Sequence, residues 1–498
     1  MFNFSKSKYC GLWQCPKIVW LDRYKSEERC IDGSALSRME NGNAVGDLAM
    51  QLFGELNEVT AYTDGKIDLV KMHELTKQYI SEGRDNICEA SFIYNGLYCA
   101  VDILRKTKRG YAIFEVKSSS HEDYIYIVDI AYQRYVLEKC GVNVTATYLI
   151  NINSNYVRGK ELDINKLFKI TDVTKWVTEE QHNTEKYLAQ AEKILQSDVE
   201  PAIDISEKCC DPYGCGYWNY CTRHVPTPSV FDLYRFPFKK KLACYLSGIL
   251  SYDDVVHSQY SLNATQRRQI DFALNDKPPH VDKKRIKAFL NTLSYPLYFL
   301  DFETMQPVIP EFEGTHPYQQ IPFQYSLHYV DSEDGELQHK EFLAESGVNP
   351  LRAIAESLVA DIPTDVCVLA YNKAFECTRL KELAEMFPDL ANSLLQIKDN
   401  IKDLLDPFRQ GAYYNKAMGG SFSIKSVLPA MFPNDPTLDY HNLQGVHNGG
   451  EAMSIFPKIK DMTPDEQQIA RHNLLKYCEL DTFAMVKIWQ ELVRITNE

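Results

Sequence analysis

Two largely apolar runs on either side of a polar turn predict a β-hairpin in the first half of the chain. Two β-prone runs, residues 97–104 (LYCAVDIL) and 111–117 (YAIFEVK), flank a polar turn at 105–110. A helical pattern at about 127–140 and a β-prone run at 145–151 follow. Strand, strand, helix and strand in this order indicate an α/β core.

The first domain is expected to end at a proline-containing linker. A charged helix is predicted at residues 172–197, and a cysteine-rich loop extends to Cys221. The segment Val225-Pro226-Thr227-Pro228 then has the composition of a linker. We therefore predict a first domain at residues 1–225 and a helical linker region at 226–294.

A second α/β domain is predicted for residues 295–498. The pattern favours strands at 297–302, 323–330 and 366–371, a helix at 373–386 and a long helix at about 465–495. A chain of 498 residues is too long for one core of ordinary size, so two or three domains are expected.

Composition says more about where the protein is located than about the reaction that it performs. The 54 basic and 68 acidic residues give a net charge of −14, so any nucleic-acid contact needs local basic patches such as residues 239–241 and 283–287. These patches are equally well explained as solvated helix faces. No run of 18 apolar residues predicts a membrane span, and residues 1–25 lack the apolar core of a signal peptide, so we expect a cytoplasmic protein.

The hairpin carries the first candidate site. Glu115 and Lys117 are two residues apart on one strand and share a face, and folding the hairpin about residues 108 and 109 places Asp102 opposite Glu115. Two carboxylates suit Mg²⁺ or Mn²⁺, and a lysine can stabilise developing negative charge. The alternative is a solvent-facing cross-strand ion pair.

Gln133 completes a pattern of Asp, Glu-x-Lys and Gln that resembles the RecB-type branch of the PD-(D/E)XK nucleases. This resemblance implies a restriction-endonuclease-like fold and a catalytic site of Asp102, Glu115, Lys117 and Gln133. Related nucleases often carry a metal-binding His in a Gly-x3-His pattern of the first helix. Here Gly42 is followed by Gly46 at that position, and Asp47 or Glu89 is the available substitute.

Cysteines at both ends of the first domain form a candidate metal cluster. Ten of the fourteen cysteines precede residue 222, and in the cytosol such a set indicates metal binding rather than disulfides. Cys210, Cys215 and Cys221 are spaced closely enough to bind one centre, and Cys15 is the best fourth ligand, with Cys10 and Cys209 as alternatives. The arrangement resembles the iron–sulfur RecB-family nucleases, which implies a 4Fe–4S cluster; zinc or simple burial are the alternatives.

The second candidate site combines four acids and a tyrosine. Asp301 and Glu303 share a strand face, Glu376 follows Asn372 by four residues, and Tyr477 and Asp481 share one face of the last helix. Four carboxylates at one place repel one another unless divalent cations lie between them, as in two-metal phosphoryl chemistry.

These three blocks resemble the DEDD exonucleases of the RNase H-like fold, in their tyrosine variant. The resemblance implies metal binding by Asp301, Glu303, Glu376 and Asp481 and orientation of the attacking water by Tyr477. Glu376 departs from the pattern, which usually has Asp. The whole fusion, opened by Ser5-Lys6-Ser7 and Cys15-Pro16-Lys17, resembles an uncharacterised bacterial family with a domain of unknown function.

The resemblances together imply a metal-dependent DNA nuclease. We expect two nuclease domains that act on single-stranded ends in DNA repair or in defence against foreign DNA. Two alternatives stay open: an RNA 3′–5′ exonuclease whose first domain only binds, and a non-catalytic nucleic-acid scaffold, which Gly46 and Glu376 suggest.

Overall fold

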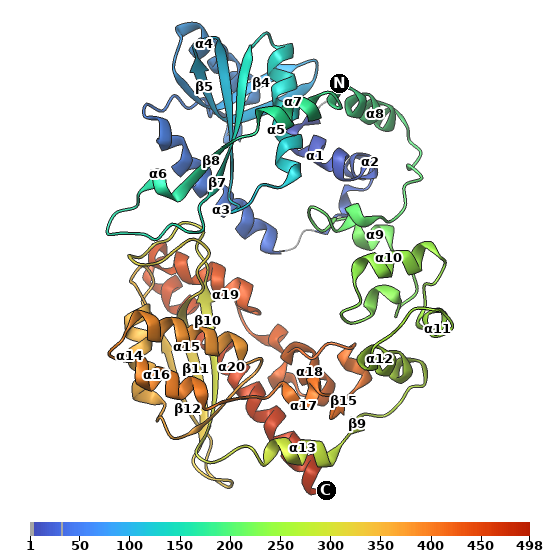
Figure 1. Ribbon diagram of the computed structural model, residues 1–498, viewed down its shortest axis with the longest axis vertical. Coiled ribbons are helices and arrows are strands. Elements are labelled where there is room, and N and C mark those ends of the chain that lie inside the picture. Colours follow the sequence, from blue (N-terminus) through green and yellow to red (C-terminus); the bar gives the residue numbers. More distant parts are fainter. Residues whose placement is uncertain (1–3, 31–32) are drawn as a thin grey trace. The chain divides into compact units, whose positions relative to one another are not determined.

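The computed structural model describes residues 4–30 and 33–498, and the chain divides into two compact units (Figure 1). The first unit contains residues up to His224 together with Val308–Tyr318, and the second contains Val225–Pro307 and Gln319–Glu498. The helical region 226–294, predicted as a linker, is therefore part of the second unit. Both units combine helices with mixed sheets, which confirms the α/β class.

The first unit is built around a six-stranded mixed sheet. Its strands are β1 (Phe4–Ser5), β4 (Asn86–Tyr94), β5 (Leu97–Thr107), β6 (Gly110–Lys117), β7 (Val144–Ile152) and β8 (Phe168–Asp172). β4, β5 and β6 form an antiparallel meander, β7 returns parallel to β6, and β8 is antiparallel to β7. The short β1 pairs with β5 in parallel.

Helices pack around this sheet and form the rest of the first unit. They are α1 (Lys6–Gln14), α2 (Pro16–Tyr24), α3 (Gly33–Met50), α4 (Leu69–Glu82), α5 (Tyr124–Lys139), α6 (Ile164–Leu167), α7 (Thr174–Gln181), α8 (Thr184–Gln196) and α9 (Trp218–Cys221), with a small hairpin of β2 (Tyr62–Thr63) and β3 (Lys66–Ile67). α5 packs against α1 and α7. Local capping sets the boundaries: Asp68 accepts a hydrogen bond from Lys71 N at the start of α4, and Gly83 ends it at φ 72°.

The predicted single helix at 172–197 is wrong. β8 occupies residues up to Asp172, and two helices, α7 and α8, follow it. Asp172 ends the strand and accepts a hydrogen bond at 2.9 Å from Thr174 N, which starts α7. His182 and Asn183 separate the two helices, and both are weak helix formers.

The two faces of the first sheet pack into separate hydrophobic clusters. Ile113 belongs to the cluster that contains Tyr132 and other residues of α5. Its neighbours Phe114 and Val116 belong to the cluster that contains Val45 of α3. Because side chains alternate along a strand, Glu115 and Lys117 face the same side as Ile113, toward α5.

The second unit has a five-stranded sheet in the order β12-β11-β10-β13-β14. Its strands are β10 (Leu297–Met305), β11 (Ile321–Val330), β12 (Gln338–Leu343), β13 (Cys367–Ala370) and β14 (Ile401–Asp403). The central β10 is antiparallel to β11 and parallel to β13, β12 is antiparallel to β11, and β14 is parallel to β13.

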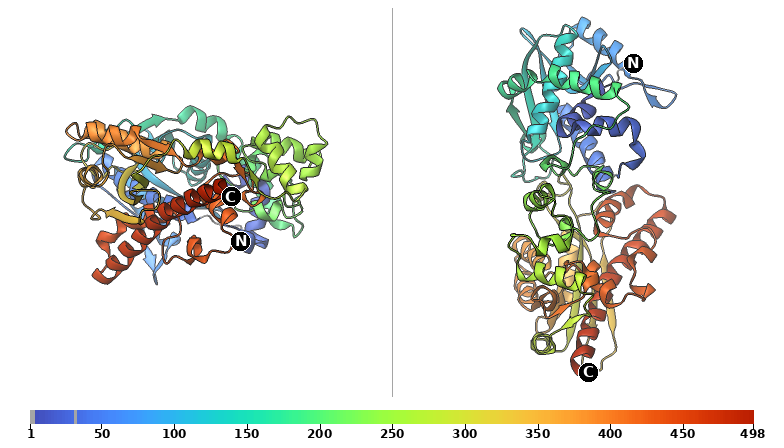
Figure 2. Two further views of the ribbon diagram at one scale, coloured as in Figure 1. Left: turned by 90° about the horizontal axis from the view of Figure 1, so that it is seen from below. Right: turned by 90° about the vertical axis from the view of Figure 1, so that its right-hand side faces the viewer.

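Helices lie on both faces of this sheet. The helices of this unit are α10 (Phe238–Leu246), α11 (Tyr252–Val256), α12 (Ala264–Leu274), α13 (Lys283–Leu290), α14 (Leu351–Asp361), α15 (Ala374–Met386), α16 (Ala391–Asp399), α17 (Asp406–Arg409), α18 (Ile424–Met431), α19 (Gly449–Ile455) and α20 (Pro464–Asn497), with β9 (His280–Val281) paired to β15 (Tyr413–Tyr414). Figure 2 shows α20 as the long red helix that leads to the C-terminus. Thr463 and Glu466 form a capping box at its start.

Side-chain hydrogen bonds to two helices identify which face of β10 and β11 packs against α20. Ser326 shares a hydrogen bond with Thr482 of α20 at 2.6 Å, whereas Tyr325 on the other face donates to Asp361 of α14 at 2.6 Å. Asp301 pairs with Ser326 across the strands, so Asp301 and Glu303 face α20.

Candidate functional site

The first acidic site lies where β5 and β6 separate. Paired residues run from Thr107 and Gly110 to Ile103 and Phe114, the register predicted from the sequence, and Asp102 continues it opposite Glu115. Asp102 accepts a hydrogen bond from Val116 N at 2.6 Å. The carboxylate of Asp102 is thereby held beside the strand that carries Glu115.

Glu115 accepts hydrogen bonds from three side chains. Lys117 Nζ lies 2.7 Å from one carboxylate oxygen and Lys6 Nζ lies 3.1 Å from the same oxygen. Gln133 Nε2 donates to the other oxygen at 2.8 Å. Glu115 is only 1% exposed, so these donors replace the water that a surface carboxylate would bind. All four predicted residues of the site, Asp102, Glu115, Lys117 and Gln133, therefore come together.

Two lysines offset part of the negative charge of this site. Asp129 contacts Lys117 at 2.8 Å and Gln133 at 2.9 Å. Burial and the charge of Asp102 raise the pKa of Glu115 to about 7. Burial lowers the pKa of Lys117, but the nearby Asp129 and Glu115 outweigh it and hold that pKa above its ordinary value, so the lysine stays charged.

Lys6 and Asp129 are site residues that sequence reasoning missed. Lys6 lies 3.7 Å from Asp102, and the pairing of β1 with β5 brings it there from the start of the chain. The available signal for Asp129 was its position four residues before Gln133, on the same helical face. For Lys6, no local pattern marks a contact across 109 residues of sequence.

Glu89 is a further acid at the first site. Cys88 and Ala90 pair with Ile103 and Val101, so Glu89 lies opposite Asp102 in the sheet. Its φ of 54° is unusual for a residue with a side chain. Burial and the charge of Asp102 raise its pKa to about 7. Of the two substitutes for the missing His at Gly46, Glu89 lies at the site, whereas Asp47 is exposed.

Cys209, one of the alternative ligands, lies near three of the four predicted cysteines. Burial raises the pKa of Cys15, Cys215 and Cys221, and the neighbouring Cys209 adds to each of these increases. The predicted Cys210 is exposed. A hydrogen bond from Cys215 N to Cys209 O at 2.9 Å closes the loop that brings these two together.

Cys10, the other alternative ligand, belongs to a different environment. Burial raises its pKa, and the charge of Asp129 adds to that effect while Lys117 and Lys6 oppose it. Cys10 thus lies near the first acidic site. Cys15 lies near the start of the first unit and Cys209 near the end of it.

The second acidic site brings together strand β10 and helix α20. One carboxylate oxygen from each of Asp301, Glu303 and Asp481 lies within 4.8 Å of the others. Burial and the charge of Asp481 raise the pKa of Asp301 well above its ordinary value and that of Glu303 to about 8. Burial raises the pKa of Asp481 to about 6, although hydrogen bonding from Tyr440 opposes the change.

Two tyrosines and a lysine border these acids. Tyr440 donates a hydrogen bond to Asp481 at 2.6 Å, and its ring lies 6.0 Å from that of the predicted Tyr477. Lys425 Nζ lies 5.3 Å from the Tyr440 ring centroid and 5.6 Å from that of Tyr477, and its charge lowers the pKa of Asp301, Glu303 and Asp481. Tyr440 was not predicted from the sequence.

Glu376 lies at the margin of this site. It occupies the first turn of α15, is 2% exposed, and its Oε2 atom has no hydrogen-bond partner. Its charge helps raise the pKa of Asp301, yet it is not one of the three acids grouped within 4.8 Å. Burial and the neighbouring Asp403 raise the pKa of Glu376 to about 8, whereas Asp399 is exposed and paired with Lys398 at 2.8 Å.

A pocket of about 1130 Å³ adjoins the second acidic site. Lys425 and Tyr440 line it, together with the proline-containing segment from Pro429 to Pro436. Tyr440 therefore contacts both the pocket and the carboxylate of Asp481. The pocket has room for an organic group beside the acids.

Comparison with known proteins relates the second unit to a family of unknown function. Residues 298–423 match the family model described as "Domain of unknown function (DUF2779)". The matched segment includes Asp301, Glu303 and Glu376, but it ends before Tyr477 and Asp481. No solved structure matches the chain significantly.

Three relatives are uncharacterised proteins. One from Mycoplasma genitalium is 22% identical over 85% of this chain and 68% of its own length. A homologue from Mycoplasma pneumoniae is 27% identical over 43% of this chain and 35% of its own length. A Ureaplasma parvum protein is 26% identical over 43% of this chain and 33% of its own length. The aligned regions thus span about two thirds of the first relative and about a third of the other two.

None of the described helices combines the length and apolar composition that a bilayer span requires. The family match covers only part of the second unit, and the relatives are themselves uncharacterised.

Proposed function

We propose that the protein is a metal-dependent nuclease with two catalytic centres, acting on single-stranded DNA ends in repair or in defence against foreign DNA. The observation that carries this proposal is the grouping of Asp301, Glu303 and Asp481 within 4.8 Å. Buried carboxylates this close repel one another, and Mg²⁺ or Mn²⁺ would remove the repulsion because both prefer oxygen ligands.

The metal fits the residues present. The raised pKa of Glu303, about 8, reflects burial and repulsion that a divalent cation would relieve. The Oε2 atom of Glu376 is buried without a hydrogen-bond partner, as expected for a ligand or a neighbour of an ion. Bound cations would supply a polarised phosphodiester and an activated water.

Sheet topology agrees with the two folds that the sequence resembles. In the second unit, the order β12-β11-β10-β13-β14, in which only β11 runs antiparallel to the central β10, is the order expected of an RNase H-like fold. In the first unit, an antiparallel meander followed by a helix and a parallel strand is the order expected of a PD-(D/E)XK core.

Each acidic site has side chains suited to distinct tasks. In the second, Asp301, Glu303 and Asp481 would hold the metal, and Tyr477 would orient the attacking water. In the first, Asp102 and Glu115 would hold it, and Gln133 fixes the orientation of Glu115 through the 2.8 Å hydrogen bond. Lys117 supplies a positive charge for the transition state.

The thiols of Cys15, Cys209, Cys215 and Cys221 suit an iron–sulfur cluster better than zinc. Four thiolates around one zinc lie about 3.8 Å apart, because each Zn–S bond is about 2.3 Å. Among the cysteines of the described chain, no three have thiols within 4.8 Å of one another. A 4Fe–4S cluster separates its ligands further, since each thiolate binds a different iron.

Labelled single-stranded DNA and RNA of equal length test the function. With Mn²⁺ we expect DNA shortening that stops with a chelator, and that falls at least about 10²-fold in the Asp301→Asn, Glu115→Gln double variant. Asp399→Asn removes an exposed acid and is the matched control. Cleavage of RNA alone would favour the RNA exonuclease. Tight binding of either strand without cleavage would favour a scaffold.

A further inference from the structure

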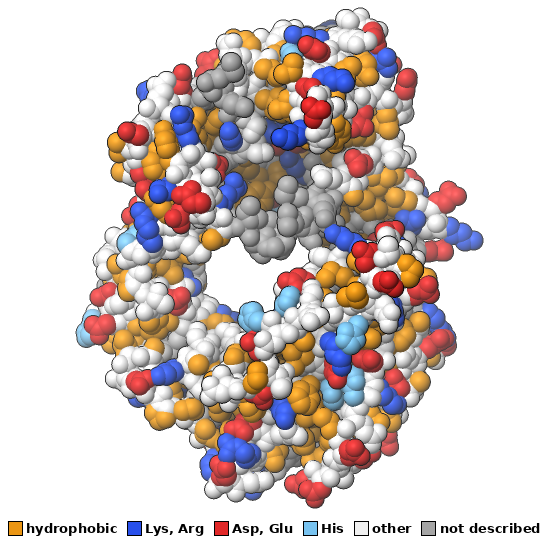
Figure 3. Space-filling view, turned by 180° about the vertical axis from the view of Figure 1, so that it is seen from behind, with side chains coloured by type: hydrophobic (Ala, Val, Ile, Leu, Met, Phe, Trp, Pro, Cys, Tyr) orange, Lys and Arg blue, Asp and Glu red, His pale blue; other side chains and the backbone are white. Residues whose placement is uncertain are grey.

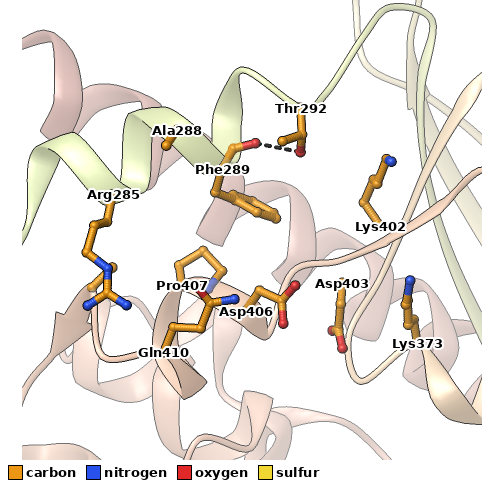
Figure 4. Close-up of a pocket in the computed structure, with 11 residues that line it drawn as sticks. Arg285, Ala288, Phe289, Thr292, Lys373, Lys402, Asp403, Asp406, Pro407 and Gln410 are labelled. Atoms are coloured by element: carbon orange, nitrogen blue, oxygen red, sulfur yellow. Dashed lines mark hydrogen bonds between the residues drawn. The ribbon is translucent and has the colours of Figure 1, made fainter.

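A separate pocket of about 480 Å³ opens in the second unit between α13 and the segment from β14 to α17. Figure 4 shows the Phe289 ring pointing into it above Pro407, with Lys373 and Lys402 to one side and Arg285 to the other. The acids proposed for catalysis do not line it. Nothing in the proposed reaction uses this pocket.

The pocket carries an excess of positive charge. Within the described residues, no carboxylate lies within 4.0 Å of the charged nitrogens of Arg285, Lys373 or Lys402. Its two acids are already compensated, because Asp403 accepts from Asn372 N at 2.9 Å and Arg409 contacts both Asp403 and Asp406. Three cations without acidic partners favour an anionic ligand.

The centre of the pocket suits a planar ring. Phe289 is half-buried, and Pro407 is buried opposite it. Thr292 and Gln410 add polar groups at the rim. Basic side chains beside an exposed aromatic face are the combination that binds the phosphates and bases of nucleic acids.

One buried carboxylate connects this pocket to the second acidic site. Lys373 immediately precedes α15, which carries Glu376, and Lys373 Nζ donates to Ile401 O at 3.2 Å. Asp403 lines the pocket and is also the neighbour whose charge acts on Glu376. The pocket therefore shares Asp403 with the surroundings of Glu376, but none of the three grouped acids lines it.

We propose that this pocket binds a nucleoside monophosphate, with the phosphate at Lys373 and Lys402 and the base against Phe289. The choice of a nucleotide over other aromatic phosphates rests on the proposed nuclease function. The ligand has two possible sources, which are a released mononucleotide and the phosphorylated end of a DNA strand.

Calorimetric titration of the full chain tests the proposal without any need for catalysis. The titrants are a deoxynucleoside 5′-monophosphate, the unphosphorylated nucleoside, inorganic phosphate, and a short oligonucleotide with a 5′-phosphate. We expect the monophosphate to bind more tightly than the nucleoside or phosphate alone. Lys402→Glu should weaken it at least about tenfold, because a charge-assisted contact is replaced by repulsion.

The matched control is Lys284→Glu, an exposed charge reversal on α13 that lies outside the pocket lining. Phe289→Ala, checked for folding by its thermal transition, should also weaken binding. Competition between oligonucleotide and monophosphate identifies a strand end as ligand, and its absence identifies the free nucleotide. Equal binding by parent, Lys402→Glu and Lys284→Glu would overturn the proposal. The titration is repeated with the Asp301→Asn variant. Because the titration does not require catalysis, a loss of nuclease activity does not change the binding result.

Discussion

The two acidic sites begin from nearly the same motif and reach opposite electrostatic states. In the first unit the strand reads Glu115-x-Lys117, and in the second it reads Asp301-x-Glu303. Lys117 and Lys6 lie 2.7 and 3.1 Å from Glu115, so the first site carries its own countercharge. The second site places three acids within 4.8 Å, and its cation, Lys425, lies over tyrosine rings instead.

This contrast shows how one residue type sets the dependence of a site on metal. A lysine two positions along the strand holds the first site in place before any ion binds. A glutamate at the equivalent position leaves the second site with repulsion that an ion must relieve. Basic and acidic side chains are interspersed over the face in Figure 3, so these differences are local features of a chain with a net charge of −14.

The largest expected effects come from removing one acid at each site. Asp301→Asn should remove one nuclease activity and Glu115→Gln another, each by at least about 10²-fold, because each site loses a ligand that positions its metal. Rates on blocked and free strand ends, measured for both variants, would distinguish the activities. If Asp301→Asn leaves every activity at the parental rate, the second unit is not catalytic.

Substitution of two adjacent cysteines should have very different effects on the bound iron and on the melting temperature. Cys209→Ser should lose most of the bound iron and lower the melting temperature of the first unit, since cluster binding contributes folding free energy. Cys210→Ser should keep both, because Cys210 is exposed. Iron analysis and absorbance of protein purified without oxygen measure the outcome. Equal loss in both variants, or stoichiometric zinc, would contradict the assignment.

Glu376 tests how far the second site extends. Glu376→Gln should lower activity about 10²-fold if this carboxylate supports the ions. Glu376→Asp should retain activity, because Asp is the usual residue in the resembling family. Full activity of Glu376→Gln, with Asp403→Asn inactive, would transfer the role to Asp403, which is buried beside it.

The effect of pH on the free energy of unfolding should be larger for the second acidic site than for the first. Glu303 has a pKa of about 8 and Glu115 of about 7, both above the ordinary 4.5. The folded protein retains protons that the unfolded chain loses, so metal-free stability should fall as pH rises from about 4.5 to 8. Thermal unfolding at several pH values should show a weaker slope in Glu303→Gln than in Glu115→Gln. Mn²⁺ should reduce the slope of the parent by replacing the protons.

The smallest effect is expected at the tyrosines. Tyr477→Phe removes a hydroxyl that orients water and should cost about tenfold in kcat, while leaving Mn²⁺ affinity unchanged. Tyr440→Phe removes the 2.6 Å hydrogen bond to Asp481, so it should weaken Mn²⁺ binding instead. A titration of Mn²⁺ against rate separates the two effects. A reversed pattern would exchange the roles of these tyrosines.

Local periodicity accounts for much of the fold and of both sites. The hairpin register that places Asp102 opposite Glu115 follows from strand alternation and the turn, and the structure has that register. The strands β1, β4, β8, β12 and β14 were not predicted, although they belong to the two large sheets. β12 is polar and partly exposed at a sheet edge, and β14 has three residues, so neither has a clear alternating pattern.

The sequence by itself determined which residues share a strand or helix face: Glu115 with Lys117, Asp301 with Glu303, and Tyr477 with Asp481. Only the tertiary structure decided what meets those faces. Lys6 reaches Glu115 across 109 residues, Cys209 lies near Cys15, and Tyr440 contacts Asp481. The reason is physical. Backbone geometry repeats over a few residues and can be read locally, whereas contacts between distant segments depend on how whole elements pack.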